Sequence, residues 1–268
     1  MPACDERKVE LVALPYRITP EGDAALMVRF GTEVDDALVG LSQAAARRLE
    51  GGAVEGVTDV VPGYCTVMVC YDPLLVTYTE LCAQVGLRLH GLDAAGAPAA
   101  QGRLLEVPVC YEGDLAPDLA DVAAHAGLDP DEVVRRHAAG TYLVCLLGFL
   151  PGFAYLSGLD PSIACPRLET PRTLVPAGAV GIAGTQTGMY PLASPGGWRL
   201  IGRTPARLYD PALADPVPYR PGDRLRFRSV SRAEFDELAA RAAEGAQLVV
   251  DRGAPRTRRR ATTTREEA

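Results

Sequence analysis

The chain has 268 residues and a formal net charge of −7 at pH 7. That length is long for one small domain and suits two, and a chain of this size buries enough surface to fold without disulfides. The negative charge argues against nucleic acid as the partner of the protein body.

Lysine and cysteine usage restricts the chemistry further. Lys8 is the only lysine, so no later lysine can form a Schiff base or serve a phosphate-binding loop, and an anion must be held by arginine or backbone N–H groups. The 7 cysteines form no Cys-x-x-Cys pair, and no apolar signal segment or membrane span is evident. We therefore expect reduced thiols, no metal site, no membrane association and a cytoplasmic location.

The N-terminal part alternates between strand and helix patterns. Apolar and β-branched residues predict strands over 24–30 and 57–71, whereas apolar positions at helical spacing predict helices over 35–49 and 78–89. These elements indicate a compact α/β unit with a small sheet.

A stretch of small residues separates this unit from the rest. Residues 93–102 lack large apolar side chains and read as a linker. We therefore predict an N-terminal α/β domain over 1–95 and a second domain over 96–250. Residues 252–268 hold 6 arginines and 2 glutamates, a net of +4. The segment 251–268 is accordingly predicted to be a disordered basic tail without assigned function.

The second domain begins with a strand over 104–111 and two short helices. The first helix is expected over 118–126 and the second over 129–137, where Asp129 is the expected N-cap and Pro130 the first helical residue. Beyond Thr141 the pattern turns to short strands with Gly and Pro punctuation, as in a β-barrel. A final helix is expected after the capping box Ser231-Arg-Ala-Glu.

Glycine, proline and aromatic residues are densest between residues 147 and 204. Such residues fix the shapes of loops, and loops held by a scaffold carry much of the binding chemistry of proteins. We expect the functional site in this segment.

The loop around the only tryptophan is the first candidate. Consecutive glycines after a proline allow backbone N–H groups to converge on an anion, although a tight turn between strands explains them as well. An aromatic wall beside a guanidinium suits a small planar anion. The predicted binding residues here are Ser194, Gly196, Gly197, Trp198 and Arg203.

A second candidate lies just upstream, where glycines surround Gln186, Thr187 and Tyr190. Their amide and hydroxyl groups suit a substrate carbonyl, and a simple turn is the alternative. This glycine pattern lacks the lysine of a phosphate loop.

Four further side chains complete the set of candidates. Tyr155 carries a hydroxyl that needs a partner, in a segment where the neighbouring Phe149 and Phe153 suit core packing or the site equally. Arg167 and Arg172 suit bidentate binding of a carboxylate or phosphate, or structural ion pairs. His137 is a candidate acid or base, with a structural role as the alternative. The catalytic residues stay unassigned, with His137, Tyr155, Gln186 and Arg203 as candidates.

The Gly/Pro/aromatic segments, in their order along the chain, resemble the KipI family, also called allophanate hydrolase subunit 1 or, in another form, the B subunit of 5-oxoprolinase. Ala179 departs from the serine expected in the run Pro-Ala-Gly-Ser-Val-Gly-Ile-Ala-Gly. The resemblance implies an α+β fold, with a small N-terminal α/β domain followed by a cyclophilin-like β-barrel domain.

The resemblance also implies a function. Proteins of this kind act in an ATP-dependent 5-oxoprolinase that opens 5-oxoproline to glutamate. Their partners are the C subunit, which is of the allophanate hydrolase subunit 2 type, and the lactam-binding A subunit. ATP with Mg is expected in the complex, with neither a bound metal nor biotin on this chain, and the chain is expected to be inactive alone.

Two alternatives from other classes stay open. A KipI-type inhibitor would dock on a sensor histidine kinase and lower its autophosphorylation. Half of a biotin-dependent urea or amide carboxyltransferase would work beside a biotin carrier, and no Met-Lys-Met attachment site occurs here.

Overall fold

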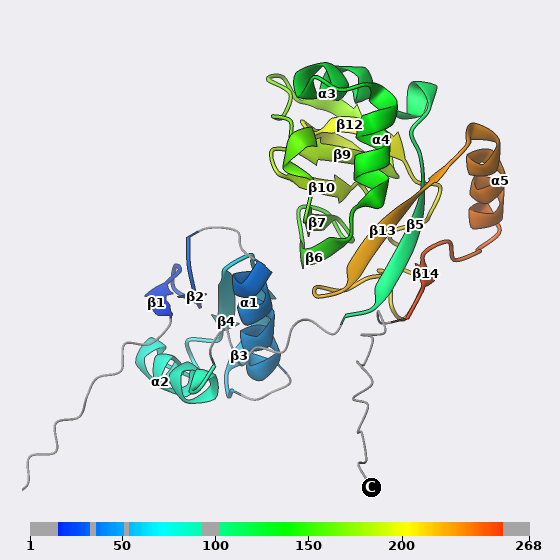
Figure 1. Cartoon of the computed structure of the whole chain (residues 1–268). Coiled ribbons are helices and arrows are strands. Elements are labelled where there is room, and N and C mark those ends of the chain that lie inside the picture. The colour runs from blue at the N-terminus through cyan, green and yellow to red at the C-terminus, as the bar shows by residue number, and fades with distance from the viewer. Residues whose placement is uncertain (1–15, 33–35, 51–53, 93–101, 254–268) are drawn as a thin grey trace, which may run out of the picture. The chain divides into compact units, whose positions relative to one another are not determined.

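The computed structural model describes residues 16–32, 36–50, 54–92 and 102–253. The chain divides into two compact units, with the division between residues 99 and 100 (Figure 1). Most of the predicted linker, 93–102, lies outside the described residues, so the domain boundary at residue 95 stays a prediction.

The first unit is a four-stranded sheet with two helices. The sheet has the order β1-β2-β4-β3, and each neighbouring pair is antiparallel. Its elements are β1 (Arg17–Pro20), β2 (Ala25–Arg29), α1 (Asp36–Leu49), β3 (Val57–Pro62), β4 (Thr66–Tyr71) and α2 (Tyr78–Leu89). The single strand predicted over 57–71 is wrong, because the chain reverses there and the Gly63 N–H donates to the Thr66 carbonyl at 2.7 Å. The residues are therefore the two arms of a hairpin.

The bounds of helix α2 are determined by interactions between residues that are close in the sequence. Thr77 and Glu80 form a capping box, in which the Thr77 hydroxyl accepts from the Glu80 N–H and the Glu80 carboxylate accepts from the Thr77 N–H. Leu81, Val85 and Leu89 recur at a spacing of four residues and are buried. Capping and one apolar face both come from neighbouring residues, so the predicted helix over 78–89 is confirmed.

The second unit is built on a barrel. Its eight-stranded sheet runs β12-β9-β10-β7-β6-β13-β5-β14, and a further pairing of β12 with β5 closes seven of these strands on themselves. The strands are β5 (Leu104–Cys110), β6 (Tyr142–Leu147), β7 (Ala154–Ser157), β9 (Ala179–Ala183), β10 (Gln186–Met189), β12 (Arg199–Arg203), β13 (Arg224–Val230) and β14 (Val250–Asp251). A separate two-stranded sheet joins β8 (Arg172–Val175) to β11 (Ser194–Gly196).

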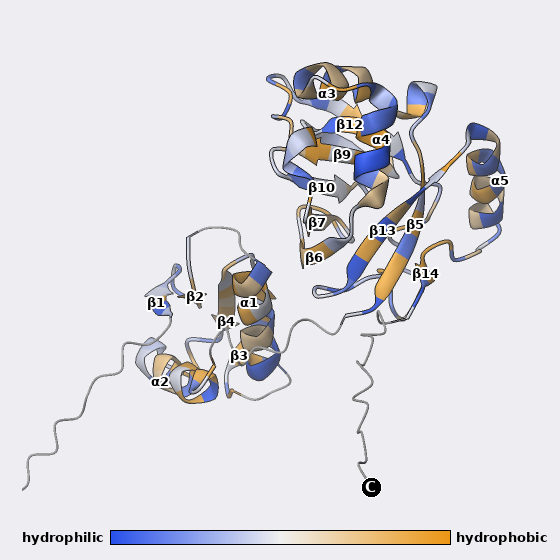
Figure 2. Ribbon diagram, viewed as in Figure 1, coloured by the Kyte–Doolittle hydropathy of each residue, from blue (hydrophilic) through white to orange (hydrophobic). Residues whose placement is uncertain are grey.

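The α-helices among the described residues of this unit are α3 (Leu119–Ala126), α4 (Pro130–Ala139) and α5 (Arg232–Ala243), beside two short 3-10 helices, η1 (Gly113–Leu115) and η2 (Pro161–Ile163). In Figure 2 each α-helix carries both hydrophobic and hydrophilic segments, as expected for helices with one buried face. The predicted N-cap Ser231 accepts from the Glu234 N–H. The predicted cap at Asp129 makes no side-chain bond to the helix, although Pro130 is the first helical residue as expected.

The C-terminal strand shortens the predicted tail. Asp251 pairs with Leu105 in the sheet, and the Arg252 guanidinium donates to the Glu106 carboxylate at 2.6 Å. The tail predicted from residue 251 therefore starts too early, and residues 254–268 lie outside the described residues.

The architecture as a whole confirms the predicted mixed α+β class with a β-barrel in the second unit. Among the residues described, none of the helices combines the length and apolarity that a membrane crossing requires.

Candidate functional site

A cluster of aromatic rings packs against the sheet of the barrel. Phe153 stands just before β7, Tyr190 just after β10 and Trp198 between β11 and β12. The Phe153 ring centroid lies 5.0 Å from that of Tyr190 and 5.5 Å from that of Trp198, both edge-to-face. Tyr155 meets Phe153 at 4.8 Å and Trp198 at 6.0 Å. Edge-to-face contacts at these separations are favourable, so the rings support one another.

Two glycines make this packing possible. A Cβ at Gly188 in β10 would lie 2.9 Å from Cζ3 of Trp198 and 3.1 Å from Cζ of Phe153. A Cβ at Gly196 in β11 would lie 2.9 Å from Cε1 of Tyr190. Gly188 and Gly196 therefore allow aromatic rings to approach the backbone closely.

The rings enclose a cavity of about 230 Å³. Half of its ten lining residues are aromatic, and one is a cation, Arg167, whose guanidinium lies over the Trp198 ring at 5.8 Å from the centroid. The lining residues are Phe149, Phe153, Tyr155, Arg167, Pro171, Tyr190, Pro195, Gly196, Gly197 and Trp198. We call this space the aromatic pocket.

The electrostatics of the aromatic pocket favour an anion. Burial raises the pKa of Tyr190, while the Trp198 backbone N–H and the guanidinium groups of Arg167 and Arg172 act in the opposite direction. The hydroxyl therefore stays protonated at neutral pH and available as a donor. Flat aromatic walls, a phenol and a guanidinium together suit a small planar molecule that carries a negative charge.

Six of the residues predicted from the sequence meet in the aromatic pocket. They are Tyr155, Arg167, Tyr190, Gly196, Gly197 and Trp198. The segment 147–204 thus supplies all ten lining residues.

His137 and Thr187 lie elsewhere, in the interior of the barrel. Both side chains are 0% exposed. His137 Nδ1 lies 2.8 Å from the Tyr111 hydroxyl, and its Nε2 lies 2.9 Å from Thr187 Oγ1, which in turn donates to the Gly181 carbonyl at 2.9 Å. Because the Thr187 proton is used on Gly181, Nε2 carries the imidazole proton and Nδ1 accepts from Tyr111.

The environment of His137 keeps the ring neutral. Its imidazole stacks on Phe227 with centroids 4.7 Å apart, and burial lowers the pKa to about 3. A histidine satisfied on both nitrogens and closed to solvent is suited to holding the barrel together. We therefore keep His137 and Thr187 out of the proposed binding site.

Arg172 is held by a buried carboxylate. Its Nη2 donates to Asp118 Oδ1 at 2.6 Å, and Asp118 Oδ2 accepts from the Leu200 N–H at 2.6 Å. Asp118, which the sequence placed inside a helix over 118–126, instead precedes α3 and uses its side chain to tie that helix to β12 and β8. Arg172 thus acts on the aromatic pocket through its charge and does not line it.

The remaining candidates are scattered. Arg203 donates from Nε to the Ala177 carbonyl at 2.9 Å and lines a different cavity of about 370 Å³, beside Phe235 of α5. Ser194 is buried at the start of β11, and Gln186 opens β10 opposite Ala183. None of these three lines the aromatic pocket.

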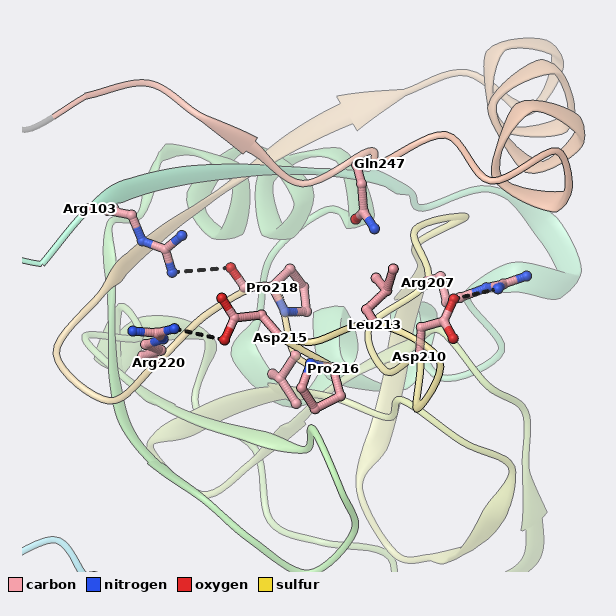
Figure 3. Close-up of a pocket in the computed structure, with 10 residues that line it drawn as sticks. Arg103, Arg207, Asp210, Leu213, Asp215, Pro216, Pro218, Arg220 and Gln247 are labelled. Carbon is pink, nitrogen blue, oxygen red and sulfur yellow. Dashed lines mark hydrogen bonds and ion pairs between the residues drawn. The ribbon is translucent and has the colours of Figure 1, made fainter. Parts of the chain in front are cut away.

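A third cavity, of about 140 Å³, lies between the segment 207–220, which precedes β13, and the side chains of Arg103 and Gln247 (Figure 3). Its guanidinium groups already have carboxylate partners: Arg103 with Asp223 at 2.6 Å, Arg207 with Asp210 at 2.7 Å and Arg220 with Asp215 at 2.8 Å. Guanidinium groups that are already paired are not free to bind an anion, so we do not assign a ligand to this cavity.

Sequence reasoning missed two prolines and left two phenylalanines, Phe149 and Phe153, undecided between the core and the site, and all four line the aromatic pocket. Pro171 and Pro195 line the aromatic pocket, and Phe149 stands at its edge, 61% exposed. No sequence signal marked Phe149, because a positive φ at a non-glycine residue is visible only in the structure.

The fold agrees with the comparisons to known proteins. The chain matches the carboxyltransferase domain family, subdomains C and D, over residues 16–219, and it belongs to that family. It is 38% identical to the B subunit of 5-oxoprolinase from Bacillus subtilis strain 168 over 229 residues, which cover 82% of this chain and 95% of the relative. The resemblance inferred from the sequence motifs is thereby confirmed.

Two solved structures are similar to this chain in fold. A conserved protein of Pyrococcus horikoshii is 41% identical, with a TM-score of 0.50 over 82% of this chain and 100% of that one. The Kluyveromyces lactis urea carboxylase has the same fold, with a TM-score of 0.69 at 18% identity, and the match covers 88% of this chain but 23% of that enzyme.

In the part of the chain that the structure describes, no group of three or more His, Cys, Asp or Glu side chains is placed to hold a metal ion. The described cysteines are all free.

Proposed function

We propose that this chain belongs to an ATP-dependent 5-oxoprolinase complex as one of its subunits, and that its aromatic pocket binds the lactam substrate or an intermediate made from it. The observation that carries the proposal is the 38% identity to the B subunit of 5-oxoprolinase over 95% of that protein. The aromatic pocket supports it, because 5-oxoproline is a small, flat cyclic amide with one carboxylate, and the pocket offers aromatic walls and a guanidinium.

The chemistry explains why ATP is required. Opening a stable five-membered lactam with water is unfavourable without coupling. Transfer of the γ-phosphoryl group to the amide oxygen activates the ring carbon, and water then adds to that carbon. The ring C–N bond breaks, the nitrogen takes a proton, and the resulting acyl phosphate is hydrolysed by a second water. The products are glutamate, ADP and phosphate.

In this proposal each group in the aromatic pocket has a binding task. Trp198 and Phe153 present apolar surfaces to the flat ring. Arg167 pairs with the carboxylate or with the phosphate of the activated intermediate. The hydroxyls of Tyr155 and Tyr190 are donors for an oxygen of the ligand. These groups bind and orient the ligand, and holding a reactant in place is a large part of catalysis.

The catalytic groups and the nucleotide are assigned to the complex. The aromatic pocket has room for one small ring, and the described residues gather no carboxylate cluster around it for Mg. We therefore propose that ATP with Mg, and the acid and base of the reaction, come from partners of the C-type and A-type. The chain alone is then inactive. Free cysteines support a reducing, cytoplasmic setting for this complex.

The test is glutamate formation from 5-oxoproline and ATP by this chain mixed with its partner subunits, with each one omitted in turn. Turnover should require all of them. Undiminished turnover in the absence of this chain would refute the proposal, as would a fully assembled complex that makes no glutamate.

Arg167 offers a sharper variant of this test. Arg167→Gln should raise KM for 5-oxoproline about tenfold with a smaller change in kcat, because a charge-assisted hydrogen bond is worth roughly 1.5 to 3 kcal/mol. Arg135→Gln is the matched control, since this exposed arginine of α4 pairs with Glu132 away from the aromatic pocket. Equal kinetics for both variants would remove Arg167 from the site.

A second candidate function rests on the family and the fold. The carboxyltransferase family match and the urea carboxylase structure favour half of a biotin-dependent carboxyltransferase for urea or a related amide. The same reconstitution distinguishes the two, because carboxyl transfer needs a biotinylated carrier and bicarbonate, whereas 5-oxoproline cleavage needs neither.

A further inference from the structure

The loop that enters the aromatic pocket holds a phenylalanine in an unfavourable backbone conformation. Among the non-glycine residues that the structure describes, Phe149 alone has a positive φ, of 67°. Its ring is also 61% exposed. Large side chains rarely adopt this left-handed region, and such residues persist where the surrounding structure imposes the conformation, often at ligand sites.

The loop imposes this conformation through its own framework. The Leu150 N–H donates to the Gly148 carbonyl at 2.8 Å, and the Phe153 N–H donates to the Leu150 carbonyl at 3.0 Å. The base of the loop is anchored in the barrel, because the buried Tyr219 hydroxyl donates to the Gly152 carbonyl at 2.6 Å. Phe149 is therefore positioned by the loop and not by burial of its own ring.

The exposed ring is directed at the aromatic cluster. Its centroid lies 5.6 Å from that of Phe153 and 6.4 Å from that of Tyr190, edge-to-face in both cases, and Phe149 lines the aromatic pocket. A ligand in the pocket would remove water from a ring that the free protein leaves exposed. The apolar surface of Phe149 thus contributes little to folding and is available for binding.

We infer that Phe149 is a specificity-determining residue that covers a flat cyclic amide in the aromatic pocket while Arg167 takes the carboxylate of the same ligand. The inference rests on the proposed function for the identity of the lactam. Each residue then recognises a different part of the ligand. Phe149 contacts the flat, uncharged ring, and Arg167 binds the negatively charged carboxylate.

Trp198 supplies a direct binding assay, since it is the only tryptophan in the sequence and lines the pocket. The full chain is titrated with 5-oxoproline, with 2-pyrrolidinone, which lacks the carboxylate, and with proline, whose ring contains a charged amine. Fluorescence of Trp198 gives Kd for each. The wild-type chain should bind 5-oxoproline most tightly of the three.

Two substitutions separate the ring from the loop conformation. Phe149→Gly and Phe149→Asn both remove the ring, and both residues accept a positive φ. Each should raise the Kd for 5-oxoproline about three- to tenfold, because the loss of one favourable aromatic contact weakens binding by about that factor. Each should also narrow the preference for 5-oxoproline over proline without lowering the melting temperature. Leu87→Asn, which removes a similarly exposed apolar side chain from α2, is the control and should bind as the wild type does.

Three results would overturn the inference. Trp198 fluorescence of the wild-type chain that does not respond to 5-oxoproline would show that the pocket does not take the lactam. A loss of binding in Phe149→Gly but not in Phe149→Asn would assign the effect to loop rigidity. Unchanged binding in both, with weaker assembly of the complex on size exclusion, would make Phe149 a docking residue. Phe149-dependent binding in a complex that makes no glutamate would instead refute the proposed function and leave this inference standing.

Discussion

Replacing His137 should remove part of the acid sensitivity of the barrel. The imidazole is buried and neutral, and burial lowers its pKa from 6.5 to about 3. The unfolded chain takes up a proton at His137 below pH 6.5, and the folded chain does not until about pH 3. The stability that this residue contributes is therefore complete above pH 6.5 and falls as the pH drops toward 3.

The magnitude follows from the size of the shift. One pH unit between the two pKa values costs roughly 1.4 kcal/mol, so His137 alone should remove roughly 2 to 3 kcal/mol between pH 6.5 and 4.5. The His137→Gln variant has a side chain that does not titrate, so it lacks this pH-dependent loss of stability. It also loses the stacking on Phe227 and one hydrogen bond, which lowers its stability by a pH-independent offset.

The assay is urea unfolding followed by Trp198 fluorescence at half-unit steps from pH 4.5 to 7.5. Trp198 reports on the second unit alone, since it is the only tryptophan. The wild-type curve should fall more steeply with acid than that of the variant, whatever the offset between them. Parallel curves would refute the assignment of His137 as a neutral, buried residue.

Three other substitutions test the framework of the site. Asp118→Ala should lower the free energy of unfolding by about 2 to 3 kcal/mol, measured by urea titration, because it strands the half-buried guanidinium of Arg172; a loss below 0.5 kcal/mol would contradict this. Gly196→Ala should cost about 1 to 3 kcal/mol and weaken ligand binding, since its Cβ would press on the Tyr190 ring. Tyr219→Phe leaves a buried loop carbonyl without its donor, so hydrogen exchange of residues 148–153 should accelerate; unchanged exchange would separate that bond from loop order.

Local patterns predicted those parts of the fold that local interactions determine. The helix over 78–89 needed only its cap and its apolar spacing. Asp118 shows the limit, because its carboxylate accepts from the backbone N–H of Leu200, 82 residues away, and nothing near it in the sequence indicates that partner. Barrel closure was equally hidden, since the pairing of Arg203 in β12 with Cys110 in β5 leaves no periodic trace.

The candidate site was predicted at the level of a segment and only in part at the level of residues. Side chains alternate between the two faces of a strand. In β10 that alternation sends Thr187 into the barrel interior and places Gly188 under the aromatic rings, although the two are adjacent in sequence. Without the register of β10 against β7 and β9, no pattern could tell which of them faces the pocket.

The parallel pairing of β5 with β13 also limits how early in synthesis the barrel can close. Leu104 pairs with Arg224, so the first strand of the barrel meets this neighbour only after 120 more residues have been synthesised. At ~5 to 20 residues per second, that is a wait of roughly 6 to 24 seconds. The N-terminal sheet needs no such partner and can finish folding on the ribosome. During the wait, β5 lacks the neighbour β13, although Val107 and Val109 of β5 are fully buried in the finished barrel.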